Sequence, residues 1–178
     1  MRNYQEHSNF IFKIADRRLR NLFKPHEYGK IILPLIVLKR LDSIIYDKKQ
    51  NIINLYEKWK NKTEDYHEII LNKLKLNFFN TSPYDLKKLT QDPQNIKANF
   101  DNYIKGFSSN VSEIIENFDI DKEIIKLDKN NRLFTLIEEF SEIDFSPEKV
   151  SNFDMGLIFE ELLRRFSELS NETSGEHY

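Results

Sequence analysis

Hydrophobic residues recur every three or four positions along most of the chain, which is the spacing of amphipathic helices. The first pattern predicts a helix from Ser8, as N-cap, to Leu22, and the last predicts one from Asp154 to about Leu169. No segment alternates cleanly with period two, and no internal repeat is evident. We therefore expect an all-α, compact multi-helix domain of about eight to ten helices. The shorter helices are predicted at 49–60, 64–76, 84–89, 93–105, 109–117, 121–128 and 132–143.

The second predicted helix, from Pro25 to about Tyr46, is apolar on nearly all sides. Such a helix is normally central and buried. Pro25 suits a first-turn position, whereas Pro34 lacks a backbone N–H inside the helix and should kink it. We therefore expect a long, buried, Pro-kinked second helix at the centre of the core.

Local signals predict where several helices begin and end. Ser82-Pro83 is typical of a helix start, and so is Ser146-Pro147. Gly106 is expected to end the helix before it, and Asp119 is expected to cap a helix. In the last helix, Glu160–Arg164 and Glu161–Arg165 stand in the favourable i,i+4 order for ion pairs.

The segment 171–178 follows the last predicted helix and is polar, with one glycine. We interpret residues 1–170 as one helical domain and residues 171–178 as the start of a loop that leads into a further domain. On this interpretation the loop should be poorly ordered when that domain is absent.

The composition excludes several classes of chemistry. The chain has no Cys, so it has neither disulfides nor a thiol nucleophile, which fits a reducing cytoplasm. The start of the chain lacks the apolar core of a signal peptide. The longest apolar run, Ile31–Leu38, is far too short to span a bilayer. We therefore expect a cytoplasmic location and no membrane partner.

Positive charge is concentrated at one end of the sequence. Residues 1–60 hold 13 Lys and Arg against 6 Asp and Glu, while residues 61–178 hold 14 against 23. Lysine and arginine supply most of the non-specific affinity for DNA phosphates, but a mixture of solvated helix faces would give the same counts. If the cations bind DNA, the candidates are Arg17, Arg18, Arg20, Lys24, Lys30, Lys39 and Arg40.

Patterns of metal binding and catalysis are absent or incomplete. The four His are dispersed and four scattered Gly make no phosphate-binding loop, so we predict no metal site. The stretch from Asp119 to Glu123 lacks the glycine and the twelfth-position glutamate of a calcium loop. The carboxylates Glu138, Glu139, Glu142 and Asp144 are typical of a solvated helix face. No catalytic residue is predicted.

Several segments resemble one family when they are taken together and in this order. They are Phe12–Arg20, Tyr28–Asp42, Phe79–Ser82, Met155–Leu162 and Leu169–Tyr178. This order is similar to the N-terminal helical domain of the modification (M) subunit of type I restriction-modification systems, over residues 8–178. Phe12 stands where the family often has Trp, and the chain ends before the family's Thr-Pro-Arg.

The resemblance implies a function that the composition alone does not. Such subunits are S-adenosylmethionine-dependent DNA adenine N6-methyltransferases, and they assemble with a specificity subunit and a restriction subunit. Their Asn-Pro-Pro-aromatic catalytic motif does not occur in this chain, so this fragment is expected to be inactive alone. A second modification subunit is another expected partner.

By the same resemblance, Glu176, His177 and Tyr178 belong to a loop of the methyl-donor pocket. They are expected to bind little S-adenosylmethionine without the domain that completes that pocket, so no cofactor is expected on this fragment. The accessory domain is expected to contribute to DNA enclosure and subunit contacts. The alternative is an independent helical adaptor that binds a partner helix.

Overall fold

The computed structural model describes residues 3–175, with the backbone alone described for residues 173–175. In this part of the chain there are ten α-helices, three short 3-10 helices and no strand beyond an isolated bridge between Asn80 and Phe107. The predicted all-α class is therefore confirmed. The α-helices are α1 (Tyr4–Leu19), α2 (Tyr28–Ile45), α3 (Lys49–Trp59), α4 (Tyr66–Leu74), α5 (Leu86–Leu89), α6 (Ile96–Lys105), α7 (Ser109–Phe118), α8 (Asp121–Lys129), α9 (Leu133–Ser141) and α10 (Asn152–Gly175). The 3-10 helices are η1 (Pro25–Glu27), η2 (Tyr46–Lys48) and η3 (Pro93–Asn95).

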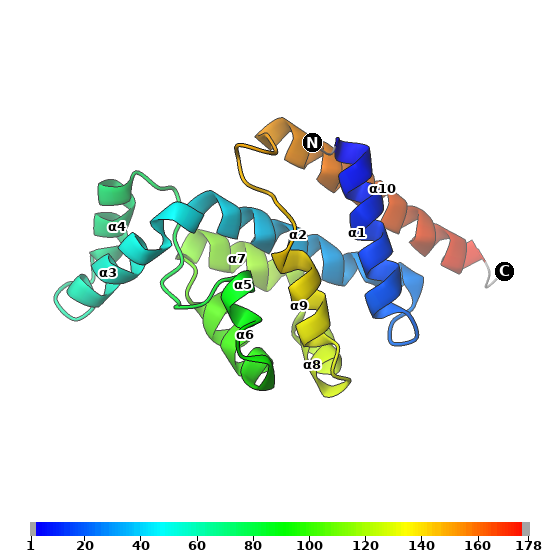
Figure 1. Cartoon of the computed structure of the whole chain (residues 1–178), viewed down its shortest axis with the longest axis horizontal. Helices are drawn as coiled ribbons and strands as arrows, with labels where there is room; N and C mark the ends of the chain where they lie inside the picture. The colour runs from blue at the N-terminus through cyan, green and yellow to red at the C-terminus, as the bar shows by residue number, and fades with distance from the viewer. Residues whose placement is uncertain (1–2, 176–178) are drawn as a thin grey trace.

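Helix α2 forms the axis of the domain, and α1, α5, α7, α9 and α10 all pack against it (Figure 1). Ile32 and Leu35, on two sides of Pro34, are almost completely buried. Pro34 lies inside the continuous helix, where its missing N–H leaves the carbonyl of Lys30 without its usual donor. Burial of the surrounding apolar side chains offsets that loss. The prediction of a long, buried second helix is confirmed, whereas the kink expected at Pro34 stays a prediction.

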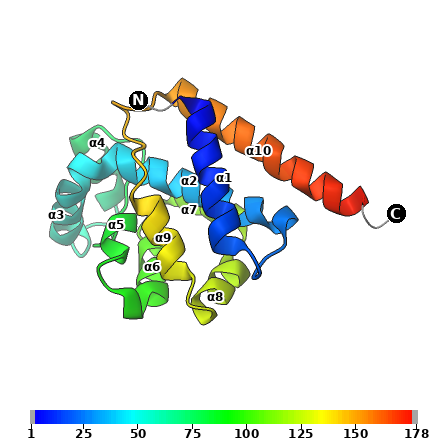
Figure 2. The same cartoon turned by 45° about the vertical axis from the view of Figure 1, so that its right-hand side comes forward.

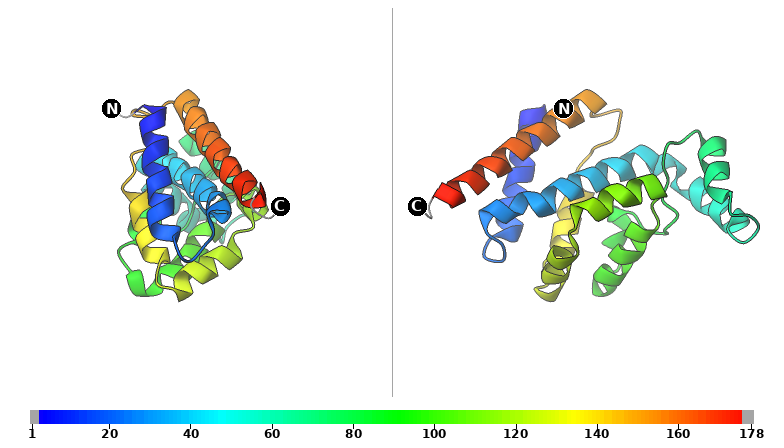
Figure 3. Two further views of the ribbon diagram at one scale, coloured as in Figure 1. Left: turned by 90° about the vertical axis from the view of Figure 1, so that its right-hand side faces the viewer. Right: turned by 180° about the vertical axis from the view of Figure 1, so that it is seen from behind.

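Helix α10, the last helix, packs against the first elements of the chain, α1, η1 and α2 (Figures 2 and 3). The contact with α2 is close because Gly29 has no side chain. A Cβ atom at Gly29 would lie 3.0 Å from the Cβ of Phe166. The Phe166 ring stacks on Phe12 of α1, with ring centroids 5.5 Å apart. One aromatic side chain thus joins α10 to both helices.

A buried polar junction connects the segment before α5 with the end of α6. Asn80 donates to the carbonyl of Tyr103 and accepts hydrogen bonds from Lys49 Nζ and the amide of Ser82. A Cβ atom at Gly106 would lie 2.6 Å from Asn80 Oδ1, so only glycine fits there. Gly106 also ends α6, as predicted. The Phe79–Ser82 motif therefore has a structural role in this fold.

Two predicted helix starts are wrong because other side chains supply the cap. Asn3, not Ser8, caps α1 by accepting from the amide of Glu6. Ser8 lies on the buried face, one turn inside the helix, where its hydroxyl donates to the Tyr4 carbonyl. Asp85, not Ser82, caps α5 by accepting from the Lys88 amide. The Ser82 hydroxyl instead donates to Asn102 Oδ1 and accepts from the Tyr84 amide.

The last helix differs from its prediction at both ends. Residues 147–149 form a turn, so no helix starts at Ser146, and the last helix begins at Asn152, two residues before the predicted Asp154. It continues to Gly175, so residues 171–175 are helical and not part of a loop. Arg164 pairs with Glu161 and Glu168 in place of the predicted partner. Asp119, however, is a helix cap as predicted, at the C-terminus of α7 with φ 51°.

Candidate nucleic-acid interface

Three cationic side chains share one face of α1. Lys13, Arg17 and Arg20, together with Phe12 and Asp16, line a shallow depression of about 430 Å³. All three cations are exposed, and the side chains of Arg17 and Arg20 are 51% and 63% accessible. Helical spacing explains the grouping, because positions 13, 17 and 20 fall on one side of an α-helix.

A fourth cation reaches this face from α10. The guanidinium of Arg165 lies 4.1 Å from the ring centroid of Phe12, and its Nη1 donates to Asn9 Oδ1 at 2.7 Å. Stacking on an aromatic ring holds an arginine side chain in place without consuming all its donors. We call Lys13, Arg17, Arg20 and Arg165 the α1 basic face.

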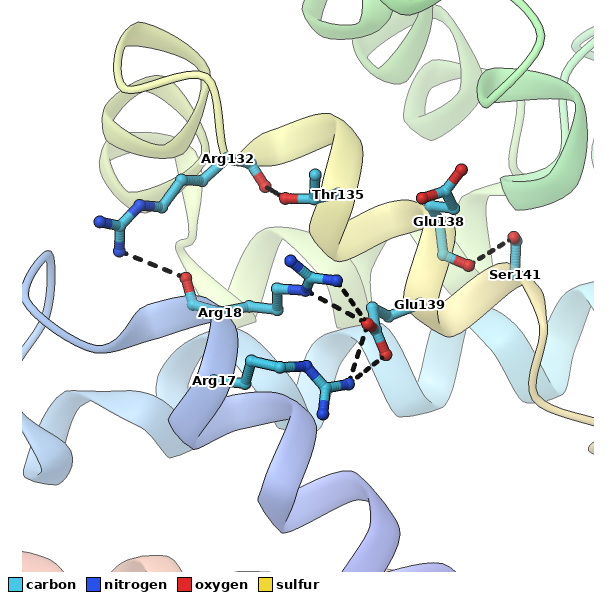
Figure 4. A network of polar contacts seen from close by, with 7 residues as sticks. All are labelled: Arg17, Arg18, Arg132, Thr135, Glu138, Glu139 and Ser141. Carbon is cyan, nitrogen blue, oxygen red and sulfur yellow. Dashed lines mark hydrogen bonds and ion pairs between the residues drawn. The ribbon is translucent and has the colours of Figure 1, made fainter.

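The two arginines at the end of α1 share one carboxylate of α9, as Figure 4 shows. Arg17 Nη2 donates to both oxygens of Glu139 at 2.9 Å, and Arg18 donates to Oε1 through Nε and Nη2. Burial raises the pKa of Glu139, but the hydrogen bonds from Arg18 and Arg17 outweigh it and hold that pKa below its usual value. Glu139 is therefore expected to be charged at neutral pH, and it ties α1 to α9.

Arg17 keeps donors for a further ligand despite this ion pair. Its Nε and Nη1 have no hydrogen-bond partner in the described part of the chain. Arg20 uses Nη2 for Asp16 of the same helix. Arg132, from the start of α9, donates to the carbonyls of Arg18 and Arg20, which a cation at a helix C-terminus does favourably.

The other predicted cations are distributed differently. Lys24 is exposed in the turn after α1 and has no ion pair among the described residues. Lys30 pairs with Glu123 of α8 at 3.0 Å, and this hydrogen bond and charge raise the pKa of the lysine. Lys39 is partly buried and donates to the Ser141 carbonyl at 3.1 Å. These three side chains do not join the α1 basic face.

Arg40 is a structural residue. It is only 8% exposed, and its Nη1 donates to the carbonyls of Phe145 and Val150 at 2.9 and 2.8 Å. Its Nη2 donates to Asn152 Oδ1 at 2.8 Å. These bonds fix the connection between α9 and α10 to α2. Arg40 therefore lies apart from the α1 basic face, and these donor contacts are all made inside the fold.

Comparison with known protein families adds the decisive observation. The model of the HsdM N-terminal domain matches residues 7–140, which is three quarters of the chain. The chain belongs to this family. It is the N-terminal domain of the modification subunit of a type I restriction-modification system. No curated protein and no solved structure shows significant similarity to the chain.

The HsdM match covers only part of the candidate interface. Lys13, Arg17 and Arg20 lie inside residues 7–140, whereas Arg165 comes from α10, beyond the matched range. The family's segments around Gly29, Arg40 and Asn80 take part in packing and buried hydrogen bonds. The positions that carried the resemblance are thus mainly those that build the fold.

Two members of the basic face were not among the predicted cations. Lys13 stands four residues before Arg17, and this i,i+4 spacing could have identified it. Arg165 had no such signal, because its approach to Phe12 depends on the return of α10 to α1. Of the remaining predictions, Glu176, His177 and Tyr178 lie outside the described residues.

The described residues, 3–175, contain neither a metal-binding cluster nor a membrane-spanning helix. In that part of the chain, His, Asp and Glu side chains form no group of three or more that could hold a metal ion. None of the described helices is long and apolar enough to cross a bilayer.

Proposed function

We propose that this HsdM N-terminal domain serves a DNA adenine N6-methyltransferase subunit as its helical accessory domain, and that the α1 basic face contacts DNA phosphates. Family membership supports the accessory role over an independent adaptor. The observation that carries the DNA contact is the gathering of four cations from two helices on one exposed surface.

The chemistry of the face suits phosphate better than bases. Lys13 is exposed with no partner among the described residues, and Arg17 has two nitrogens to offer. Arg165 is held in place by Phe12 and Asn9. Contacts to phosphate position a protein on the duplex but carry little sequence information. Target recognition would then come from a specificity subunit, and this domain would help to enclose the DNA.

The proposal assigns no catalysis to this chain. In the parent subunit, S-adenosylmethionine would be the methyl donor, and the catalytic motif would lie in another domain. Glu176, His177 and Tyr178 would contribute only to the edge of that cofactor site. The proposed partners are the specificity and restriction subunits and a second modification subunit. We expect the 178-residue chain to transfer no methyl group from labelled S-adenosylmethionine to DNA.

Binding to a duplex of about 30 base pairs, measured by fluorescence anisotropy over a series of salt concentrations, tests the contact. Each phosphate contact contributes about 0.9 to the slope of log affinity against log salt. The double variant Lys13→Gln/Arg20→Gln is expected to bind more weakly and to have a salt slope smaller by about 1 to 2. Both side chains are exposed, so the fold should be unaffected.

A matched control removes the same charge elsewhere. Lys73 of α4 and Lys122 of α8 are exposed and have no ion pair among the described residues, so Lys73→Gln/Lys122→Gln should reproduce the unmodified affinity and slope. Equal losses in the two double variants would show a response to net charge alone. That result, or affinity that does not depend on salt, would exclude the α1 basic face as a DNA contact.

A further inference from the structure

A pocket of about 510 Å³ opens between the C-terminal end of α2, the start of α5 and the connection from α9 to α10. Figure 1 shows this connection rising from the end of α9 across α2 to the start of α10. Its apolar lining includes Ile44 and Tyr46, which are 40% and 67% exposed. Ile143 and Pro147 complete the apolar part. Large hydrophobic side chains so exposed beside a cavity are typical of a binding surface.

Carboxylates surround this apolar patch. Asp47 and Glu148 are exposed and have no hydrogen-bond or ion-pair partner among the described residues. Glu142 has only a long contact of 3.8 Å with Lys87, and both side chains are mostly exposed. Hydrogen bonds from the side chain and the amide of Ser146 lower the pKa of the Asp144 carboxyl group. At neutral pH the rim therefore carries a strong excess of negative charge.

Two more carboxylates lie deeper in the lining, and neither is neutralised by an ion pair. Asp85 caps α5 by accepting from the Lys88 amide. Asp42 is 7% exposed and accepts from the Tyr103 hydroxyl and the Leu86 amide. Of the two amines in the lining, Lys39 is engaged with the Ser141 carbonyl. The lining therefore holds six carboxyl groups against two amines, Lys39 and Lys87, and burial raises the pKa of one of these carboxyl groups, that of Asp42, to about 7.

We propose that this pocket is a docking site for an arginine-bearing segment of a partner protein. The guanidinium would stack on the exposed ring of Tyr46 and donate to Asp47 and Glu148, while an adjacent apolar side chain of the segment would cover Ile44 and Pro147. Tyrosine and arginine are, with tryptophan, enriched among the residues that dominate protein–protein binding energy, and arginine pairs with both aromatic faces and carboxylates.

Charge separates this site from the proposed DNA contact. A phosphate chain entering the pocket would meet the unpaired carboxylates of Asp47 and Glu148, and like charges across an interface exclude such a partner. The proposal therefore goes beyond DNA binding: it concerns a protein contact on a different surface, and the variants of the α1 basic face do not touch it.

The test is a ¹⁵N–¹H NMR titration of the chain with the peptide acetyl-Leu-Arg-Arg-Leu-amide. Saturable shifts are expected at the amides of Ile44, Tyr46 and residues 142–148. The triple variant Tyr46→Ala/Asp47→Asn/Glu148→Gln should weaken binding at least fivefold. All three side chains are exposed, and unchanged shifts in the remaining spectrum will show that the fold is retained.

A second acidic groove supplies the control. Glu116, Asp121 and Ile125 line a groove of about 500 Å³ bordered by α6, α7 and α8, where Lys97 is already paired with Asp101. The variant Glu116→Gln/Asp121→Asn/Ile125→Ala should leave peptide binding unchanged. Absence of saturable shifts up to about 5 mM peptide, a weak limit for any specific contact, would overturn the proposal. So would equal binding of acetyl-Leu-Glu-Glu-Leu-amide, or shifts confined to the second groove.

Discussion

The contact between α2 and α10 can be tested by adding a single methyl group. In Gly29→Ala the new Cβ would lie 3.0, 3.2 and 3.4 Å from Cβ, Cγ and Cδ2 of Phe166. The nearest of these atoms is fixed to the backbone of α10, and stacking on Phe12 restrains the ring. Relief therefore requires α10 to move by a few tenths of an ångström along its packed interface.

The magnitude follows from two opposing effects. Replacing glycine by alanine inside a helix stabilises it by about 0.5–1 kcal/mol, whereas overpacking a close interface costs about 1–3 kcal/mol. We expect Gly29→Ala to lower the free energy of unfolding by about 0.5–2 kcal/mol. For a domain of this size, that corresponds to a fall in Tm of about 1–8 °C.

Gly156→Ala is the matched control, because nothing lies within 4 Å of a Cβ at that position of α10. It should raise the free energy of unfolding by about 0.5–1 kcal/mol through helix propensity alone. Urea denaturation monitored by circular dichroism measures both changes. If Gly29→Ala stabilises the domain as much as Gly156→Ala does, the close approach of α2 and α10 would be refuted.

Three further perturbations test the buried and partly buried charges. Arg40→Met removes three hydrogen bonds and should lower the free energy of unfolding by about 2–4 kcal/mol. Lys39→Met removes one hydrogen bond and should lower it clearly less. Urea denaturation of the two variants measures the difference. Glu139→Gln should lower the free energy of unfolding at neutral pH by about 1 kcal/mol. The pKa of Glu139 is lowered in the folded state, so the unmodified chain loses the stability of its ion pairs as pH falls below about 4.5. The variant should therefore lose less stability over that range. Burial raises the pKa of Asp42 to about 7, so the folded state binds the proton more tightly than the unfolded state. The free energy of unfolding should therefore fall as pH rises from about 4 to 7. Thermal denaturation at a series of pH values measures this fall, and it should be absent in Asp42→Asn.

The periodic pattern of the sequence predicted most of the helices because their apolar faces are locally encoded. The bounds of α3 and α7 agree with their predictions within one residue. The starts of α1 and α5 were missed where two candidate caps compete. Ser8 and Ser82 have the right chemistry for a cap, but Ser8 lies in the core, and the Ser82 hydroxyl bonds Asn102 and the Tyr84 amide.

The candidate site was harder than the fold to predict from the sequence, because charge counts do not distinguish exposed from buried cations. Arg40 and Arg17 look equivalent in the sequence, yet one anchors the α9–α10 connection and the other lies on the surface. Arg165 reaches the α1 basic face only through a long-range contact. The acidic pocket beside Tyr46 is likewise assembled from segments about 100 residues apart.

The return of α10 to α1 also affects how the protein is made. Helix α1 ends at Leu19 and α10 begins at Asn152, so more than 130 residues must be synthesised between them. At about 5–20 residues per second, the part of α1 that packs against α10 waits roughly 7–27 s on the ribosome before α10 begins to be made. During that interval the surface around Phe12 is open to chaperones and to other nascent chains, although α1 is the first helix to be synthesised.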